Sequence, residues 1–168
     1  MLAFELLIKP TKMKPFKKAF TLTELLVVMA IVAAIAGFGI FSLSPYWRSK
    51  NLEGMAEKIA IFLEDAKAKS MVQENGSAWG VHFENPTSSQ SFFSLFYGSY
   101  SSSTVIQTVY LPNHIEFSDP SDGNSKEIIF EKLTGKTGTS TQIKIYLISS
   151  PSQQKIIEVN SFGKIEVR

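Results

Sequence analysis

The sequence predicts an α+β protein, with one long N-terminal helix followed by a headpiece built on an antiparallel β-sheet. Three observations predict this fold class. A run without any charged residue extends from Leu25 to Ser44. Apolar residues at helical spacings of three and four then recur from Leu52 to Ala66. From Ala78 onward, short β-like runs alternate with turn-forming residues, which is typical of a β-rich domain.

Residues 1–19 form a basic leader ahead of the uncharged run. They carry five lysines and one acid, a net charge of +4, whereas residues 46–168 carry 12 basic and 13 acidic side chains, a net charge of −1. A nearly neutral domain is a poor electrostatic match for nucleic acid. The 168-residue chain has no cysteine, which excludes disulfide and thiolate chemistry.

The uncharged run of residues 25–44 is long enough to cross a membrane. A helix rising about 1.5 Å per residue extends about 30 Å over this run, the thickness of a bilayer core. Lysines just before the run, among them Lys17 and Lys18, keep that end in the cytoplasm. We therefore expect residues 20–44 to be a single transmembrane helix in the inner membrane, with residues 45–168 as a periplasmic or extracellular headpiece.

One acidic residue, Glu24, lies five positions into the hydrophobic segment. An acid in a membrane span costs on the order of 3 kcal/mol, so a functional role is the default hypothesis. The alternative is a carboxylate that stays hydrated near the membrane interface.

The sequence KKAFTLTELL at positions 17–26 resembles the class III signal of type IV pilins and type II secretion pseudopilins. In that family a prepilin peptidase cuts after a small residue, usually Gly, and the new N-terminal Phe is methylated. The resemblance implies cleavage between Ala19 and Phe20, N-methylation of Phe20, and an acid, Glu24, at the fifth position of the mature chain. Ala19 in place of Gly is a conservative departure.

The resemblance also implies a function in assembly rather than catalysis. In the family, the helix 20–44 is stored in the membrane and later packs into the core of a pilus or pseudopilus. Glu24 of one subunit would pair with the Phe20 amine of its neighbour and set the axial register. The partners implied are other pilin subunits, the prepilin peptidase and methyltransferase, membrane lipid and an inner-membrane assembly platform.

An ordinary secretory signal peptide is the main alternative for the N-terminal segment. Residues 34–36 read Ala-Ile-Ala and are followed by Gly37, which matches a signal peptidase site. Cleavage after Ala36 would release a soluble exported domain. Glu24 inside the apolar region opposes this interpretation, as does the apolar run continuing through Leu43.

An amphipathic helix is expected over residues 46–75. Pro45 is expected to kink or briefly interrupt the helix, and Asn75-Gly76 is expected to end it. Asp65 and Lys69 are spaced to pair on the outer side. The apolar stripe, expected to pack on a sheet, consists of Leu52, Met55, Ala56, Ile59, Ala60, Leu63 and Ala66.

Eight strands are expected in the β-rich region of residues 78–168. In one of them, residues 142–148, Ile143, Ile145 and Leu147 share a face, which predicts a half-buried strand. Trp79-Gly80-Val81, Leu111-Pro112 and the tail at 158–167 resemble minor pseudopilins of the GspH/FimT type. The expected strands are Ala78–Glu84, Ser91–Tyr97, Thr104–Leu111, His114–Phe117, Glu127–Glu131, Gln142–Ile148, Lys155–Val159 and Lys164–Val167.

Candidate sites of chemistry are few, and we expect no catalytic residue, no cofactor and no metal. The only histidines, His82 and His114, lack the clustered ligands of a zinc site. Residue counts leave a Ser-His-Asp triad open, but there is no Gly-x-Ser-x-Gly elbow. The oxygen-rich segment 119–124 is interpreted as a turn rather than a calcium loop. The aromatic residues at 92–97 are interpreted as filling both sheet faces rather than forming an adhesive patch.

A DNA-binding minor pilin for DNA uptake is the second alternative. Some FimT-like pilins bind DNA through a basic Gly-Arg-x-Arg motif near the C-terminus, and the matching stretch here is GKIE at 163–166. Lys164 replaces the first arginine, and Glu166 replaces the second. An acid at that position repels phosphate, so DNA is not expected as a partner.

Overall fold

The computed structural model describes residues 20–168, without the side chains of residues 38–44. The chain divides into two compact units, residues 1–41 and 42–168. A single helix, α1 (Leu22–Met71), contains the boundary between them. The helix continues through Pro45, so the brief interruption expected there is not found.

The expected transmembrane helix at residues 20–44 stays a prediction. Among the residues that the structure describes, no helix is both long and apolar enough to cross a membrane.

The amphipathic part of α1 packs its predicted stripe into the core of the 42–168 unit. Leu52, Ala56 and Ile59 are buried, as are Leu63 and Ala66. Alternation at spacings of three and four places these side chains on one side of the helix, which explains why they are buried together. On the exposed side, Lys69 Nζ lies 3.7 Å from Asp65 Oδ1, so the predicted pair is confirmed.

The helix ends earlier than the sequence predicts. Its last residue is Met71, and Asn75-Gly76 lies instead in a short 3-10 turn, η1 (Glu74–Gly76). The cause is the nearby start of the first strand. The Ser70 hydroxyl accepts a hydrogen bond from the Trp79 N–H at 2.6 Å, and the Trp79 indole N–H donates to the Glu74 carbonyl at 2.9 Å. These bonds require the chain to turn back immediately after the helix.

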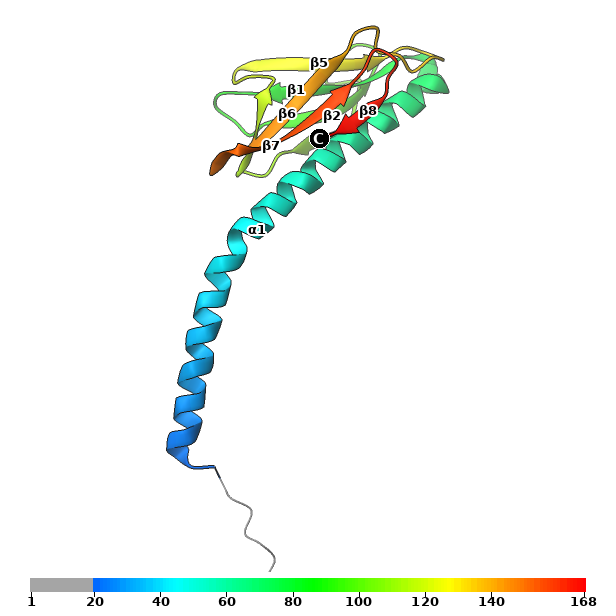
Figure 1. The fold of residues 1–168 in the computed structure, drawn as a ribbon. Helices are drawn as coiled ribbons and strands as arrows, with labels where there is room; N and C mark the ends of the chain where they lie inside the picture. The colour runs from blue at the N-terminus through cyan, green and yellow to red at the C-terminus, as the bar shows by residue number, and fades with distance from the viewer. Residues whose placement is uncertain (1–19) are drawn as a thin grey trace, which may run out of the picture. The chain divides into compact units, whose positions relative to one another are not determined.

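All eight predicted strands are present, and they form two four-stranded antiparallel sheets (Figure 1). The first sheet has the order β3-β2-β1-β5, and the second has the order β4-β6-β7-β8. The division into two sheets was not predicted. The strands are β1 (Trp79–Asn85), β2 (Phe92–Tyr97), β3 (Val105–Tyr110), β4 (Ile115–Asp119), β5 (Asn124–Phe130), β6 (Thr141–Leu147), β7 (Ser150–Val159) and β8 (Ile165–Val167).

The predicted and observed strand boundaries differ most at β7. It begins at Ser150, whereas the sequence predicts a start at Lys155 and a turn before it. The extra residues pair with the end of β6, where the register shifts between Tyr146 and Leu147. The polar composition of this stretch resembles a turn, but pairing to β6 satisfies its backbone and extends the hairpin.

The core lies between the helix and the inward faces of the strands. Ile143, Ile145 and Leu147 of β6 are buried on one face, as predicted. The aromatic residues of β2 fill both faces, because Phe93 and Phe96 are fully buried although they point to opposite sides of the sheet. The rings of Phe62 in α1 and Phe93 lie 5.0 Å apart, edge to face. An α+β headpiece with a long helix packed on antiparallel strands is therefore confirmed.

Candidate functional site

The N-terminal end of α1 is organised by Thr21. Its hydroxyl oxygen accepts a hydrogen bond from the Glu24 N–H at 3.2 Å, and its carbonyl accepts one from the Leu25 N–H at 3.1 Å. Thr21 therefore caps the helix. The sequence signal for this cap is a Thr-x-x-Glu pattern ahead of an apolar run, which our sequence-based predictions missed. Phe20 precedes the cap and is 80% exposed.

Glu24 lies in the first turn of α1 and is exposed. The positive end of the helix dipole favours a carboxylate at this position. No ion pair joins Glu24 to another residue of the described range 20–168. The other predicted processing residues, Lys17, Lys18 and Ala19, lie outside the described residues.

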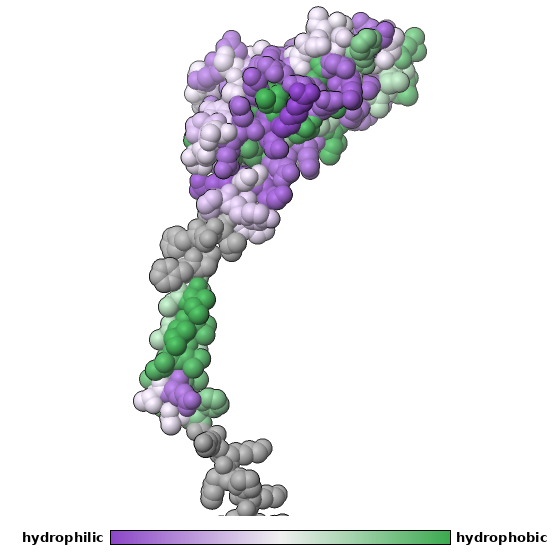
Figure 2. All heavy atoms as spheres, in the orientation of Figure 1, coloured by the Kyte–Doolittle hydropathy of each residue, from purple (hydrophilic) through white to green (hydrophobic). Residues whose placement is uncertain are grey.

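The first four turns of α1 expose many apolar side chains, and Figure 2 shows hydrophobic residues along the face of the helix that is in view. Their exposed fractions run from 49% to 74%. Fully burying one such side chain is favourable by about 1.5–3 kcal/mol, so this surface favours lipid or other helices over water. The large exposed side chains are Leu22, Leu25, Leu26, Val27, Val28, Met29, Ile31, Val32 and Ile35.

His82 has a structural setting on the outer face of the first sheet. Its Nδ1 lies 3.1 Å from Glu127 Oε1 and its Nε2 lies 3.4 Å from Glu84 Oε2. The Tyr100 ring stacks on the imidazole at 3.6 Å and leaves it only 5% exposed. The two carboxylates flank opposite nitrogens rather than converging on one point. Within residues 20–168, no group of three or more metal-ligating side chains forms a site.

The oxygen-rich segment 119–124 forms a turn, as the sequence indicates. The Gly123 N–H donates to the Asn85 carbonyl at 2.7 Å, with Gly123 at a φ of 74°. The Asp119 carboxylate contacts the Lys126 ammonium group. That ammonium group supplies the positive charge next to the carboxylate, so the segment has the contacts of a structural turn.

The basic residues of the C-terminal tail are paired with acids. Lys164 forms an ion pair with Glu166. Arg168 lies 3.2 Å from Glu166 and 3.3 Å from Glu158. Carboxylates adjacent to these cations weaken any attraction of this tail to phosphate.

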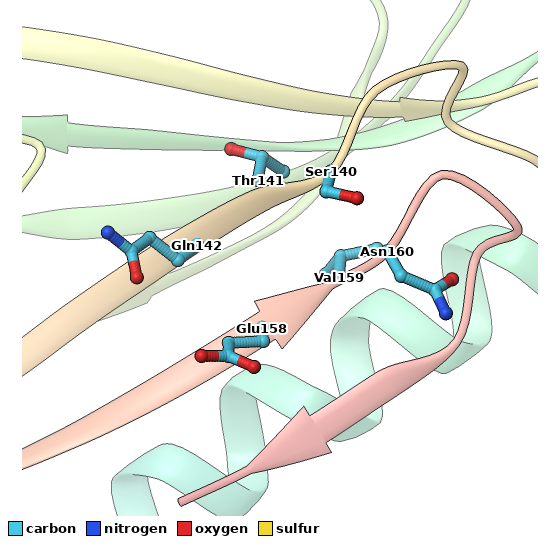
Figure 3. Close-up of a pocket in the computed structure, with 6 residues that line it drawn as sticks. All are labelled: Ser140, Thr141, Gln142, Glu158, Val159 and Asn160. Atoms are coloured by element: carbon cyan, nitrogen blue, oxygen red, sulfur yellow. The ribbon is translucent and has the colours of Figure 1, made fainter.

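The headpiece surface has several open depressions. One depression of about 360 Å³ lies where β6 begins and β7 ends. Figure 3 shows Gln142 and Glu158 side by side on these two strands. Its lining offers a single carboxylate and no histidine, an arrangement without the groups of a metal site or an acid–base pair. The lining residues are Ser140, Thr141, Gln142, Glu158, Val159 and Asn160.

Comparisons with known proteins found a sequence motif at the N-terminal end of the chain and a similar fold over most of its length. Residues 15–40 match the model of the prokaryotic N-terminal methylation motif. Two crystal structures of the type IV minor pilin FimU from Pseudomonas aeruginosa are similar in fold. At 12% sequence identity, one covers 70% of this chain and 92% of FimU with a TM-score of 0.50. The other covers 73% and 92% with a TM-score of 0.53. No curated protein matches.

Proposed function

We propose that this chain, a type IV pilin-like protein by its N-terminal methylation motif and its fold, is a minor pilin or pseudopilin subunit. In this function the protein assembles into a type IV pilus or a type II secretion pseudopilus and catalyses no reaction. The observation that carries the proposal is the coincidence of the motif at residues 15–40 with a helix that exposes apolar side chains on every side.

Processing begins with hydrolysis of the bond between Ala19 and Phe20 by a prepilin peptidase on the cytoplasmic side. Water supplies the hydroxyl to Ala19 and the hydrogen to the new Phe20 amine, which is then methylated. Two features support this position. Phe20 precedes the helix and is largely exposed, and the cap at Thr21 fixes the start of α1 directly after it.

The mature subunit is then stored in the inner membrane with its N-terminus at the cytoplasmic side. The twenty uncharged residues from Leu25 to Ser44 supply the apolar length, and the basic leader supplies the orientation before it is removed. The headpiece of residues 45–168 then faces the periplasm or the cell exterior.

Assembly moves the apolar helix from lipid into a bundle of neighbouring helices. A lone Phe20 amine or Glu24 carboxylate in that bundle would be costly, because an unpaired buried charge loses its hydration. Glu24 of one subunit pairing with the Phe20 amine of the next removes both costs at one axial register. The exposed position of Glu24 in the first helical turn leaves its carboxylate accessible to a second chain.

The decisive experiment is mass spectrometry of the mature N-terminus, from membranes of cells with and without prepilin peptidase. We expect a chain that begins with N-methylated Phe20 only when the peptidase is present. A chain that begins at Gly37 regardless of that peptidase would refute the proposal. It would identify a soluble domain released by signal peptidase.

A further inference from the structure

One turn of α1 lies between the uncharged run and the core of the headpiece. Residues 46–50 of this turn read YWRSK, and we call them the aromatic–basic turn. All of them are exposed, with Tyr46 at 58% and Trp47 at 62%. The headpiece core begins along α1 at Leu52, which is 3% exposed. The headpiece therefore leaves the aromatic–basic turn uncovered.

The position of the aromatic–basic turn matches the headgroup layer of a membrane. The uncharged run ends at Ser44. At about 1.5 Å per residue, Tyr46 lies about 3 Å beyond that end and Arg48 about 6 Å beyond it. A bilayer is about 40–45 Å thick with its headgroups and about 30 Å thick without them, so each headgroup layer measures about 5–8 Å. Residues 46–48 therefore fall within that layer, and Leu52, about 12 Å beyond the run, lies outside it.

The side chains of the aromatic–basic turn have the chemistry of that layer. Tyr and Trp are enriched at membrane–water interfaces, because each combines an apolar ring with a polar group. The rings of Tyr46 and Trp47 lie edge to face with centroids 6.2 Å apart. Arg48 supplies a planar guanidinium group, which can bind one phosphate through two hydrogen bonds. Within residues 20–168 no carboxylate forms an ion pair with Arg48, so its charge is available.

The adjoining part of the headpiece supplies a second cation. Lys50 Nζ lies 2.7 Å from Glu53 Oε2, so the charge of Lys50 is already balanced. The start of β7 lies beside α1, where Ser49 and Lys155 line a common depression. Lys155 forms no ion pair with another residue of the part of the chain that the structure describes. Arg48 and Lys155 are therefore both free to attract lipid phosphates.

The aromatic–basic turn also faces every side of the helix. Successive residues of an α-helix are about 100° apart, so Tyr46, Trp47 and Arg48 point in different directions. A protein partner would cover one side of the helix, whereas a membrane surface surrounds a helix that passes through it. The distribution of these side chains therefore favours a lipid layer over a second protein.

The orientation of the helix does not explain the cations at this end. The positive-inside rule concentrates basic residues on the cytoplasmic side, where the leader carries five lysines. Arg48 and Lys50 follow the uncharged run on the opposite side, where the rule disfavours them. A phosphate contact accounts for a cation here, because both leaflets of a phospholipid membrane carry phosphates.

We propose that Tyr46, Trp47 and Arg48 dock in the phosphate headgroup layer at the periplasmic face of the inner membrane. The inference rests on the proposed function, in which residues 20–44 cross that membrane. The two rings lie at the level of the headgroups, and the guanidinium group binds lipid phosphate with Lys155 as a second cation. This contact fixes the depth of the helix in the membrane while the subunit is stored before assembly.

The test measures whether the aromatic–basic turn sets the depth of the helix. The chain has no cysteine, so Ser49→Cys provides a single attachment point for a nitroxide label within the turn. The labelled full chain is reconstituted in vesicles of phosphatidylcholine and phosphatidylglycerol with short, medium or long acyl chains. Electron paramagnetic resonance with a lipid-soluble and a water-soluble relaxation agent then gives the depth of the label relative to the phosphates.

We expect the label to stay level with the phosphates at every bilayer thickness, because an anchored helix end keeps its position while the helix tilts. In the triple variant Tyr46→Ala/Trp47→Ala/Arg48→Gln, the label should sink toward the hydrocarbon as the bilayer thickens, because the leader lysines then hold the other end alone. Tyr110→Ala is the matched control: Tyr110 on β3 is also 58% exposed, and its loss should leave the depth unchanged. Trp79 fluorescence verifies that each variant is folded.

A second variant separates the phosphate contact from the aromatic contact. Arg48→Gln/Lys155→Gln keeps both rings and removes both cations. We expect the label in this variant to sink with increasing thickness, but less than in the triple variant. A depth equal to that of the unsubstituted turn would overturn the phosphate contact.

Other results would overturn the whole inference. A label that follows bilayer thickness with the turn intact, or one that keeps its depth in the triple variant, shows that the turn is not an anchor. If the triple variant keeps its depth in vesicles but gives fewer sheared filaments from cells, the turn contacts another protein instead. A chain that does not float with the vesicles at all would also refute the membrane-storage step of the proposed function.

Discussion

Gly163 should be among the least replaceable residues of the headpiece. Its φ is 76°, and a Cβ at this position would lie 2.0 Å from the Gly135 carbonyl oxygen. That oxygen belongs to backbone and not to a flexible side chain. The loop that carries it is fixed by the Leu133 N–H bond to Ser70. Gly163→Ala must therefore displace either the β7–β8 turn or the β5–β6 loop.

The cost of Gly163→Ala has two parts. The left-handed conformation costs Ala about 1 kcal/mol more than Gly. Relieving the clash requires the loop to move, which weakens the hydrogen bonds of Leu133 and Gly135, at about 0.5–1.5 kcal/mol each. We expect a loss of about 2–4 kcal/mol in the free energy of unfolding. Gly98 is the matched control, because its φ is 70° and an added Cβ meets nothing within 4 Å. Gly98→Ala should cost about 1 kcal/mol.

The assay is urea unfolding of the 42–168 unit, which contains its own core. Trp79 is 1% exposed, so its fluorescence reports the loss of that core. Gly163→Ala should lower the midpoint without changing the slope of the free energy with urea. The reasoning is refuted if the two glycine variants differ by less than about 0.5 kcal/mol, the usual scatter of such measurements.

Other predictions concern the helix start, the buried hydroxyl and the tail. Glu24→Gln should leave cleavage after Ala19 intact but abolish filament assembly, as measured by sheared-filament yield; normal yield would exclude the register function. Ser70→Ala should cost about 1–3 kcal/mol in urea unfolding, because the Trp79 N–H loses its buried acceptor; a cost near zero would show that another acceptor replaces it. The hydrogen bond from Lys164 holds the pKa of Glu166 below its ordinary value, so this contribution to stability is present at neutral pH and lost as the pH falls through the folded-state pKa. An NMR titration should show that Lys164→Ala raises the pKa of Glu166, and an unchanged pKa would contradict the assignment.

The sequence determined those features that depend on local spacing. A charge-free run, an acid at a fixed offset and a basic leader are contiguous in the chain, so the N-terminal motif was recognisable without a fold. The stripe that includes Ile59 and Leu63, and the alternation of Ile143 and Ile145, follow from the periods of helix and strand. The helix end was misjudged because a turn signal at Asn75-Gly76 is local, whereas the helix end is set by Trp79 folding back on Ser70.

Only the tertiary structure decided how distant segments meet. The order of β5 beside β1, and of β4 beside β6, depends on which strand edges pair, and residue patterns along one strand carry no record of the partner. The exposed apolar side chains of Met71, Leu133 and Phe162 likewise come from the end of α1 and from two loops far along the chain. Each appears in the sequence as a single apolar residue near a turn. Their common exposure, and the strained conformation of Leu133 that maintains it, exist only after the sheets and the helix have packed.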